Sequence, residues 1–293
     1  MIRLAVVALL SLVVATASGA GGTRPLRYIA LGDSFSSGEG VPPYEAASNR
    51  YVPPHDLCHR SNQAYPALVA RRWSAPGAWR SWACSGARIR DLTNPNAENP
   101  VEPAQLDRLA LPGRSDPLID LVTLTIGGND AEFSAAWISC LASRVAPLVS
   151  GGCDRTWRPS VEASIRRVRA SLPAVFREVR ARAPRARILV LGYPNPFPAD
   201  LPALSRCSLW FAPGDTRWLG HEAAALNGAI HAAAIRSAAR VTYVAPAGFS
   251  GHDVCSDDPW FNGLELLPSR VRGSFHPNAL GQRQMARNVL ARI

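Results

Sequence analysis

The sequence predicts an α/β protein, a three-layer α/β/α sandwich built on a five-stranded parallel sheet. Five short β-rich segments alternate along the chain with segments of helical periodicity. Two of the β-rich segments, IDLVTLTI and RILVLG, are nearly continuous apolar runs, which are typical of strands buried on both faces of a parallel sheet. Strands that alternate with helices favour right-handed crossovers, which place helices on both faces of the sheet.

Each expected element follows from its local pattern. The strands are expected at residues 27–31, 79–83, 119–126, 187–191 and 241–245. The helices are expected at residues 63–73, 132–141, 161–183, 216–239 and 279–292. No internal repeat and no change of composition marks a second domain, so we expect one domain over residues 21–293.

Residues 1–20 have the pattern of a secretory signal peptide. Arg3 is followed by an apolar run from Leu4 to Val14 and then by small residues. The run is too short for a membrane span, and no other stretch approaches the necessary length. We therefore expect an exported protein without a stable membrane span, and we expect it to be a monomer.

The net charge of +10 comes from 32 basic residues that are all arginine. Such one-sided usage indicates genomic base composition rather than a nucleic-acid surface, so we expect no nucleic-acid partner. The densest run, residues 164–187, interleaves arginines with apolar residues at helical spacing. These arginines are expected on the outer face of a helix, and attraction to an anionic surface is the alternative.

Six cysteines fit export into an oxidising compartment. No CxxC pair and no Cys/His cluster with zinc spacing is present, so we expect no metal site. Six cysteines allow 15 connectivities, and pairing in chain order is the simplest because each bridge then closes one local loop. Some free thiols are the alternative. The cysteines are Cys58, Cys84, Cys140, Cys153, Cys207 and Cys255.

Polar, glycine-rich segments follow the expected strands, and parallel strands share one carboxyl edge, where ligands bind in such folds. Ser34 follows the first strand after Gly32, as a nucleophile or as a helix N-cap. Gly86 allows close approach of the backbone after the second strand. Asn129, after the third, offers a side-chain N–H to a developing negative oxygen, and Asp130 offers a cap for the next helix.

A serine nucleophile needs a base, and His276 is the best candidate among six histidines. It lies in SFHPN, just before the last expected helix and after the last strand, which places it at the same sheet edge as Ser34. His252, in GHDVC, is the second candidate.

Together these segments resemble the SGNH (GDSL) hydrolases: GDSFSSGEG, Gly86 in ACSGAR, GGND, and a C-terminal histidine in SFHPN stand in that family's order. The six cysteines and the SFHP ending are most similar to its secreted actinobacterial-type esterases and lipases. The resemblance implies a flavodoxin-like five-stranded sheet and three sequential disulfides. It also implies a serine esterase mechanism that needs no metal or organic cofactor.

Carried over by position, the resemblance implies that Ser34 is the nucleophile and His276 the general base and then acid. The N–H groups of Ser34 and Gly86 and the side chain of Asn129 would form the oxyanion hole. Asp33 would shape the turn rather than transfer protons.

One position departs from the family pattern, in which an aspartate three residues before the histidine orients the imidazole. Gly273 stands there, so we expect its main-chain carbonyl to orient His276 and Gly273→Ala to leave activity largely intact. Asp257 or Asp258 could supply the acid from another loop, in which case Asp→Asn there would cause a large loss.

The expected activity is hydrolysis of carboxylic esters of small molecules or lipids. A carbohydrate O-deacetylase of the same fold is an alternative, and a catalytically silent binding protein is another. Four aromatic residues on the loops after the fourth and fifth strands line an acyl pocket or form satellite core. They are Trp210, Phe211, Trp260 and Phe261.

Overall fold

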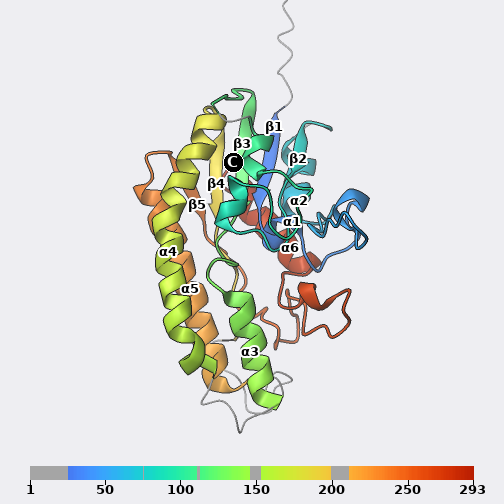
Figure 1. The fold of residues 1–293 in the computed structure, drawn as a ribbon, viewed down its shortest axis with the longest axis vertical. Helices are drawn as coiled ribbons and strands as arrows, with labels where there is room; N and C mark the ends of the chain where they lie inside the picture. The colour runs from blue at the N-terminus through green and yellow to red at the C-terminus, as the bar shows by residue number, and fades with distance from the viewer. Residues whose placement is uncertain (1–25, 75, 111–112, 146–152, 199–210) are drawn as a thin grey trace, which may run out of the picture.

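A five-stranded sheet with all neighbouring strands parallel forms the centre of the computed structural model, which describes residues 26–74, 76–110, 113–145, 153–198 and 211–293 (Figure 1). The predicted α/β class and the five strands are confirmed; β4 has the expected bounds, and each of the other strands differs by one or two residues at its carboxyl end. The strands are β1 (Arg27–Gly32), β2 (Trp79–Ser81), β3 (Ile119–Thr125), β4 (Arg187–Leu191) and β5 (Val241–Val244).

The strand order is β2-β1-β3-β4-β5, as in flavodoxin-like sheets. The chain moves outward from β1 to β2 and then returns past β1 to β3. Loops that leave β1 and β3 therefore diverge at the carboxyl edge, and such a point is where doubly wound sheets bind ligands. Ser34 follows β1 and Asn129 follows β3, so the topology brings both to this crevice.

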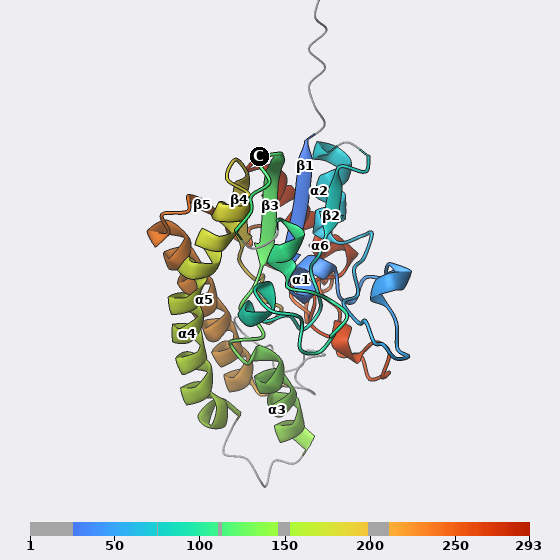
Figure 2. The same cartoon turned by 45° about the horizontal axis from the view of Figure 1, so that its top comes forward.

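The helices cover the sheet in two groups. α2 (Tyr65–Trp73) packs against α6 (Ala279–Leu290), whereas α4 (Cys153–Arg182) packs along α5 (Pro213–Arg236) and also contacts α3 (Phe133–Val145). Figures 1 and 2 show α4 and α5 side by side in both views. With α3, these two helices extend beyond the carboxyl ends of the strands (Figure 1). Residues of α3 and α5 line a cavity there.

Short elements complete the chain: α1 (Ser34–Ser37) and the 3-10 turns at Ala46–Ser48, Ile89–Leu92, Gln105–Arg108 and Val271–Gly273. α4 begins eight residues before the expected start at 161. The disulfide between Cys140 in α3 and Cys153, the first residue of α4, stabilises this added part, and periodicity cannot detect such a partner.

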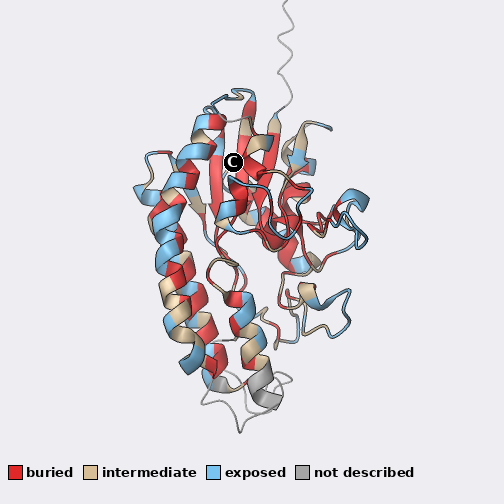
Figure 3. Cartoon of the chain, in the orientation of Figure 1, coloured by how far each residue is buried: buried red, intermediate tan, exposed pale blue. Residues whose placement is uncertain are grey.

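The predicted outer face of α4 is largely confirmed, because Arg166, Arg169 and Arg177 are exposed opposite a buried apolar stripe (Figure 3). Arg180 and Arg182 are exceptions. Arg180 donates to the carbonyl oxygens of Ala186 and Ala239, and the buried Arg182 pairs with Asp107 at 3.1 Å. These contacts join α4 to neighbouring segments.

Two of the three expected disulfides, Cys58–Cys84 and Cys140–Cys153, are present. Cys207 lies outside the described residues, as does the expected signal peptide, so both of those expectations stay predictions. In the part of the chain that the structure describes, every helix is too short or too polar to cross a membrane.

Candidate active site

Ser34 opens the short helix α1 immediately after β1. Gly32 has a φ of +121°, and a Cβ there would lie 2.2 Å from the carbonyl oxygen of Thr125, so only glycine permits this turn. The N-cap of α1 is Asp33, whose carboxylate accepts from the N–H of Phe35 at 3.1 Å. The alternative role of Ser34 as N-cap is therefore excluded, which leaves its hydroxyl available for chemistry.

Asp33 is buried and fixes this turn, as expected from the sequence. Its carboxylate also accepts from the hydroxyl of Thr125 at 2.7 Å and from that of Tyr193. Burial raises the pKa of Asp33 to about 6, although these hydrogen bonds oppose the rise. Asp33 is therefore mainly an anion at neutral pH, and it connects the ends of β1, β3 and β4.

His276 lies beside Ser34, with 2.7 Å between its Nε2 and the Oγ of Ser34. Its other ring nitrogen, Nδ1, lies 3.1 Å from the main-chain carbonyl oxygen of Ser274. An N–H at Nδ1 that donates to this carbonyl leaves Nε2 as the acceptor for the serine proton. The two residues predicted as nucleophile and base are thus in hydrogen-bond contact.

The carbonyl that contacts Nδ1 is that of Ser274, one residue after the expected Gly273, and the backbone of Gly273 makes a smaller contribution to the electrostatics of His276. The carbonyl oxygen of Gly273 accepts from the backbone N–H of His276 at 3.2 Å, which closes a turn around Phe275 with φ +61°. This turn directs the Ser274 carbonyl to the ring. A Cβ at Gly273 would lie 2.7 Å from the Cα of Gly40, so the structure contradicts the basis for expecting Gly273→Ala to be tolerated.

The alternative assignments are not supported by the geometry. The Nδ1 of His252 lies 2.9 Å from the carbonyl oxygen and 3.2 Å from the carboxylate of Asp258, and its ring stacks on Trp260. Asp258 therefore serves His252, the second candidate base, rather than His276. Asp257 is exposed, and the position next to Nδ1 of His276 is occupied by the Ser274 carbonyl.

Asn262 connects the histidine loop to the serine segment. Its side-chain Nδ2 lies 3.2 Å from the carbonyl oxygens of both Gly40 and Gly273. Its backbone N–H donates to the carbonyl of His276 at 2.9 Å, and its own carbonyl accepts from Phe275 at 3.1 Å. Three of these hydrogen bonds join Asn262 to the His276 loop, and the fourth joins it to Gly40 in the segment that follows Ser34.

The pKa of His276 is lowered from its ordinary value, mainly by burial and to a smaller extent by the positive charge of Arg272. The carboxylate of Glu39 and the Ser274 carbonyl oppose this effect. Glu39 is buried, and its carboxylate lies 2.7 Å from the Nδ1 of His59. Because the pKa lies below 6.5, the imidazole of His276 is neutral at neutral pH and can accept a proton.

Gly86 and Asn129 line the same groove as Ser34 and His276. Gly86 has a φ of +83°, which explains the glycine. The Nδ2 of Asn129 donates to the carbonyl of Ala87 at 2.9 Å, and a carboxamide has a second N–H for another acceptor. The N–H of Ser34 is in the first turn of α1, where helix N–H groups have no partner within the helix.

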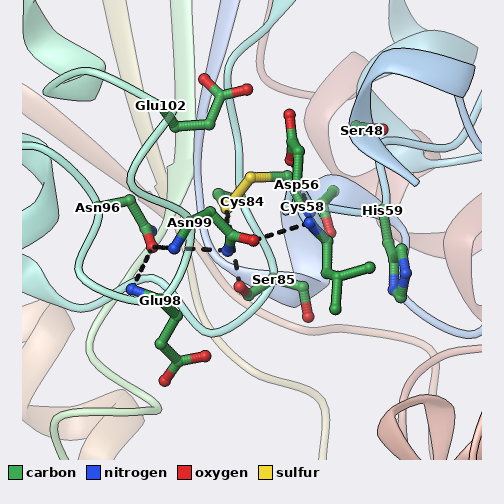
Figure 4. Close-up of a disulfide and its surroundings, with 12 residues drawn as sticks. Ser48, Asp56, Cys58, His59, Cys84, Ser85, Asn96, Glu98, Asn99 and Glu102 are labelled. Carbon is green, nitrogen blue, oxygen red and sulfur yellow. Dashed lines mark hydrogen bonds between the residues drawn. A yellow bond between two sulfur atoms is a disulfide. The ribbon is translucent and has the colours of Figure 1, made fainter. Parts of the chain in front are cut away.

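The segment that carries Gly86 is fixed from behind by the Cys58–Cys84 disulfide (Figure 4). The side chain of Asn99 donates to the Sγ of Cys84 at 3.2 Å and accepts from the N–H of Leu57 at 2.7 Å.

Asp130 accepts from the N–H of Ile89 at 3.0 Å. It therefore joins the GGND loop to the Gly86 segment, rather than capping α3 as predicted.

Two cavities meet at Ser34, and they differ in size and polarity. A narrow apolar pocket of about 40 Å³ extends toward α3 and α5, and a groove of about 390 Å³ opens to solvent. The pocket is lined by Phe133, Trp137, Tyr193, Pro194, Ala223 and Leu226. The groove carries both charge signs, from Arg88, Glu98, Glu132 and Arg272, together with apolar side chains that include Ile138, Leu141 and Leu264.

Of the two roles that the sequence left open for the four aromatic residues, the structure supports satellite core for Phe211, Trp260 and Phe261. Phe211 is buried in an aromatic cluster with Phe197 and Phe275, Trp260 and Phe261 pack against Phe249, and Trp210 lies outside the described residues. Trp137 lines both cavities instead.

Sequence analysis missed Phe133 and Trp137, although both follow GGND directly and lie four residues apart on one face of α3. The buried indole N–H of Trp137 has no hydrogen-bond partner among the described residues.

Comparisons with known proteins agree with this geometry. The family model of the GDSL-like Lipase/Acylhydrolase family matches residues 30–284. Lipase 2 of Streptomyces coelicolor is 36% identical over 94% of this chain and 88% of its own length, and a lipase of Streptomyces rimosus is 31% identical over 87% and 82%.

Among solved structures, phospholipase A1 from Streptomyces albidoflavus is similar with a TM-score of 0.71 and 29% identity, over 92% of this chain and 100% of that one. The extracellular lipase from Streptomyces rimosus has a TM-score of 0.71 and 28% identity, over 91% and 99%.

The fold and these relatives define a hydrolase of carboxylic esters. The chain belongs to the GDSL-like lipase and acylhydrolase family, which was the resemblance noted in the sequence.

Proposed function

We propose that the protein is an exported lipase that cleaves lipid acyl esters through an acyl-enzyme on Ser34. The observation that carries this proposal is the 2.7 Å contact between Ser34 Oγ and His276 Nε2, beside an apolar pocket. The extracellular lipase of Streptomyces rimosus supports export, as do the signal-peptide pattern and the disulfides. A third bridge between Cys207 and Cys255 is part of the proposal.

In the first half-reaction, Ser34 Oγ attacks the ester carbonyl carbon while His276 Nε2 accepts its proton. The carbonyl oxygen becomes negative, and the N–H groups of Ser34 and Gly86 and the free N–H of Asn129 stabilise it. The imidazolium, whose Nδ1–H donates to the Ser274 carbonyl, then protonates the leaving alcohol. Water, activated by the same histidine, hydrolyses the acyl-enzyme.

The two cavities divide the substrate by polarity. The apolar pocket takes the acyl chain, because burying methylene groups there is favourable at about 0.8 kcal/mol each. The charged groove takes the alcohol side, where polar groups stay hydrated. Trp137 lines both cavities and therefore contacts both parts of the bound substrate.

A fluorophosphonate probe tests the nucleophile. We expect a covalent adduct on Ser34 in the wild type and none in Ser34→Ala, with Ser250→Ala, at an exposed position, still labelled as the control. Labelling of Ser34→Ala at the wild-type rate would contradict the assignment. Rates on aryl esters from acetyl to long acyl chains then separate a lipase from a deacetylase, because a preference for acetyl alone would oppose the lipase.

A further inference from the structure

Four exposed apolar side chains lie on the groove or on the loop between its lining residues Leu264 and Val271, and we call them the groove rim. Ile138 is 67% exposed, Leu266 80%, Leu267 57% and Val271 47%. Ile138 comes from α3, whereas the other three come from the loop that ends at His276. Ile138 and Val271 also line the groove itself. Exposed apolar groups concentrated at one place indicate an interaction surface.

The loop that carries the two leucines is closed by hydrogen bonds, which hold its tip outward. The N–H of Glu265 donates to the hydroxyl of Ser274 at 2.9 Å, and the N–H of Val271 donates to the carbonyl of Leu267 at 2.9 Å. Figure 1 shows this loop beyond the carboxyl ends of the strands, on the same side of the molecule as α3. Leu266 and Leu267 therefore stay in water, at a cost that an apolar partner would remove.

Arginines accompany the groove rim, and glutamates lie among them: Glu98 and Glu132 line the same groove, and Glu265 directly precedes Leu266. Arg270 is exposed beside Val271, Arg88 is exposed on the groove wall, and Arg272 lines the groove while paired with Glu98 at 3.2 Å. Apolar side chains flanked by arginines are the pattern by which proteins adsorb to anionic lipid surfaces. The net charge of +10 adds a long-range attraction of the same sign.

We propose that the groove rim docks the protein on an anionic lipid bilayer, with the groove facing the lipid. This inference rests on the proposed function, because lipid esters are then delivered directly from the surface to Ser34. A second copy of the chain is the poorer occupant. A symmetric contact of rim against rim would bring the same arginines together, and like charges repel.

Vesicle binding tests the proposal without catalysis. Ser34→Ala protein is mixed with vesicles of equal parts phosphatidylcholine and phosphatidylglycerol, and the bound fraction is measured by flotation. We expect binding that falls by about tenfold in Leu266→Asp/Leu267→Asp, since two apolar anchors are lost and two negative charges are added. Binding should also fall with added salt and with pure phosphatidylcholine. Ile235→Asp on α5, at a position 71% exposed, is the matched control and should bind as Ser34→Ala does.

Activity gives the second measurement. With Ser34 present, the double variant should hydrolyse a soluble aryl ester within about twofold of the wild-type rate and lose about tenfold on an ester embedded in the same vesicles. Absence of vesicle binding, equal binding by the double variant, or equal loss in Ile235→Asp would overturn the proposal. Dimerisation that depends on the two leucines, without vesicle binding, would assign the rim to a second copy. If the wild type does not hydrolyse the soluble ester, the proposed function is contradicted instead, because vesicle binding is measured by flotation without catalysis.

Discussion

Ser34 and His276 lie 2.7 Å apart, yet the surrounding structure holds them in different ways. Ser34 follows a strand whose buried residues pair on both sides, and its turn is fixed by the neighbouring Asp33 and Gly32. His276 lies on a loop outside regular secondary structure. Its position depends on Asn262 and Ser274, and through them on Gly40, more than 200 residues away in sequence.

The turn at Ser34 is held by the ends of neighbouring strands of the sheet, through Thr125 and Tyr193, whereas the loop of His276 is joined to the serine segment by one side chain, that of Asn262. The serine side should therefore lose activity through loss of its own chemistry. The histidine side should lose it through displacement, which substitutions at residues outside direct contact with the substrate can cause.

The largest expected effect is the loss of kcat on removal of Asn129, which lies beside Ser34 in the groove. Asn129→Ala removes an oxyanion donor, and kcat should fall by about 10²–10³, measured with a soluble aryl ester. Asn129→Asp, which replaces the N–H donor with an acceptor, should be at least as damaging. Asn94→Ala on an exposed loop should retain wild-type activity. A rise in KM with an unchanged kcat would contradict the assignment of Asn129 to the oxyanion hole.

Asn262→Asp tests the histidine side with a change of a single side-chain group. The carboxylate cannot donate to the carbonyls of Gly40 and Gly273, so the His276 loop should shift and kcat should fall by up to about 10²-fold. Asn288→Asp on α6 is the control, because the side chain of Asn288 also donates to a main-chain carbonyl, that of Ala247.

The readout for Asn262 must separate positioning from folding. The rate of fluorophosphonate labelling should fall with kcat, while thermal unfolding stays close to that of the control. A labelling rate equal to the wild type would show that the loop does not depend on Asn262.

Trp137→Leu should change which ester is preferred rather than the chemistry. A smaller side chain deepens the apolar pocket, so the ratio of kcat/KM for long over short acyl esters should rise by about tenfold. Trp260→Leu, which lies against His252 and Phe249, should leave this ratio unchanged. A ratio that changes in Trp260→Leu and not in Trp137→Leu would instead favour Trp260 as the residue that lines the acyl pocket.

The smallest effect concerns the pH dependence of activity. Activity should rise with pH as His276 loses its proton, because only the neutral imidazole can accept the proton of Ser34. The negative charge of Glu39 raises the pKa of His276, and the positive charge of Arg272 lowers it. Glu39→Gln should therefore move the acidic limb of the kcat/KM profile to lower pH, and Arg272→Gln should move it to higher pH. Glu178→Gln on the exposed side of α4 should leave the limb in place, and shifts of the same sign in both variants would contradict this account.

Much of the site was accessible from the sequence because its parts are local. The apolar runs specify strands, and the polar segments GDS, CSG and GGND follow their carboxyl ends, so the order of the chain alone predicted that Ser34, Gly86 and Asn129 would gather. The histidine was found by its place before the last helix, whose N-cap Asn278 accepts from the N–H groups of Leu280 and Gly281.

The main-chain carbonyl that lies nearest to Nδ1 of His276 is that of Ser274, the residue after the expected Gly273. A main-chain carbonyl was expected from the glycine at the family's aspartate position, but the turn around Phe275 uses the Gly273 carbonyl and presents that of Ser274. A single positive φ in a non-glycine residue decides this, and no sequence pattern signals it. The sequence also left open whether the loop aromatics line the pocket or form satellite core, because packing decides which aromatic side chains face a cavity.

The sequence by itself determined the α/β class, the parallel sheet and the residues that meet at its carboxyl edge, since periodicity and strand-end motifs are local properties of the chain. Only the tertiary structure decided the Asn262 bridge, the Ser274 carbonyl, the extra turns of α4 held by Cys153, and the division between a narrow apolar pocket and a charged groove. These features depend on contacts between segments far apart in sequence, and such contacts exist only after the chain has folded.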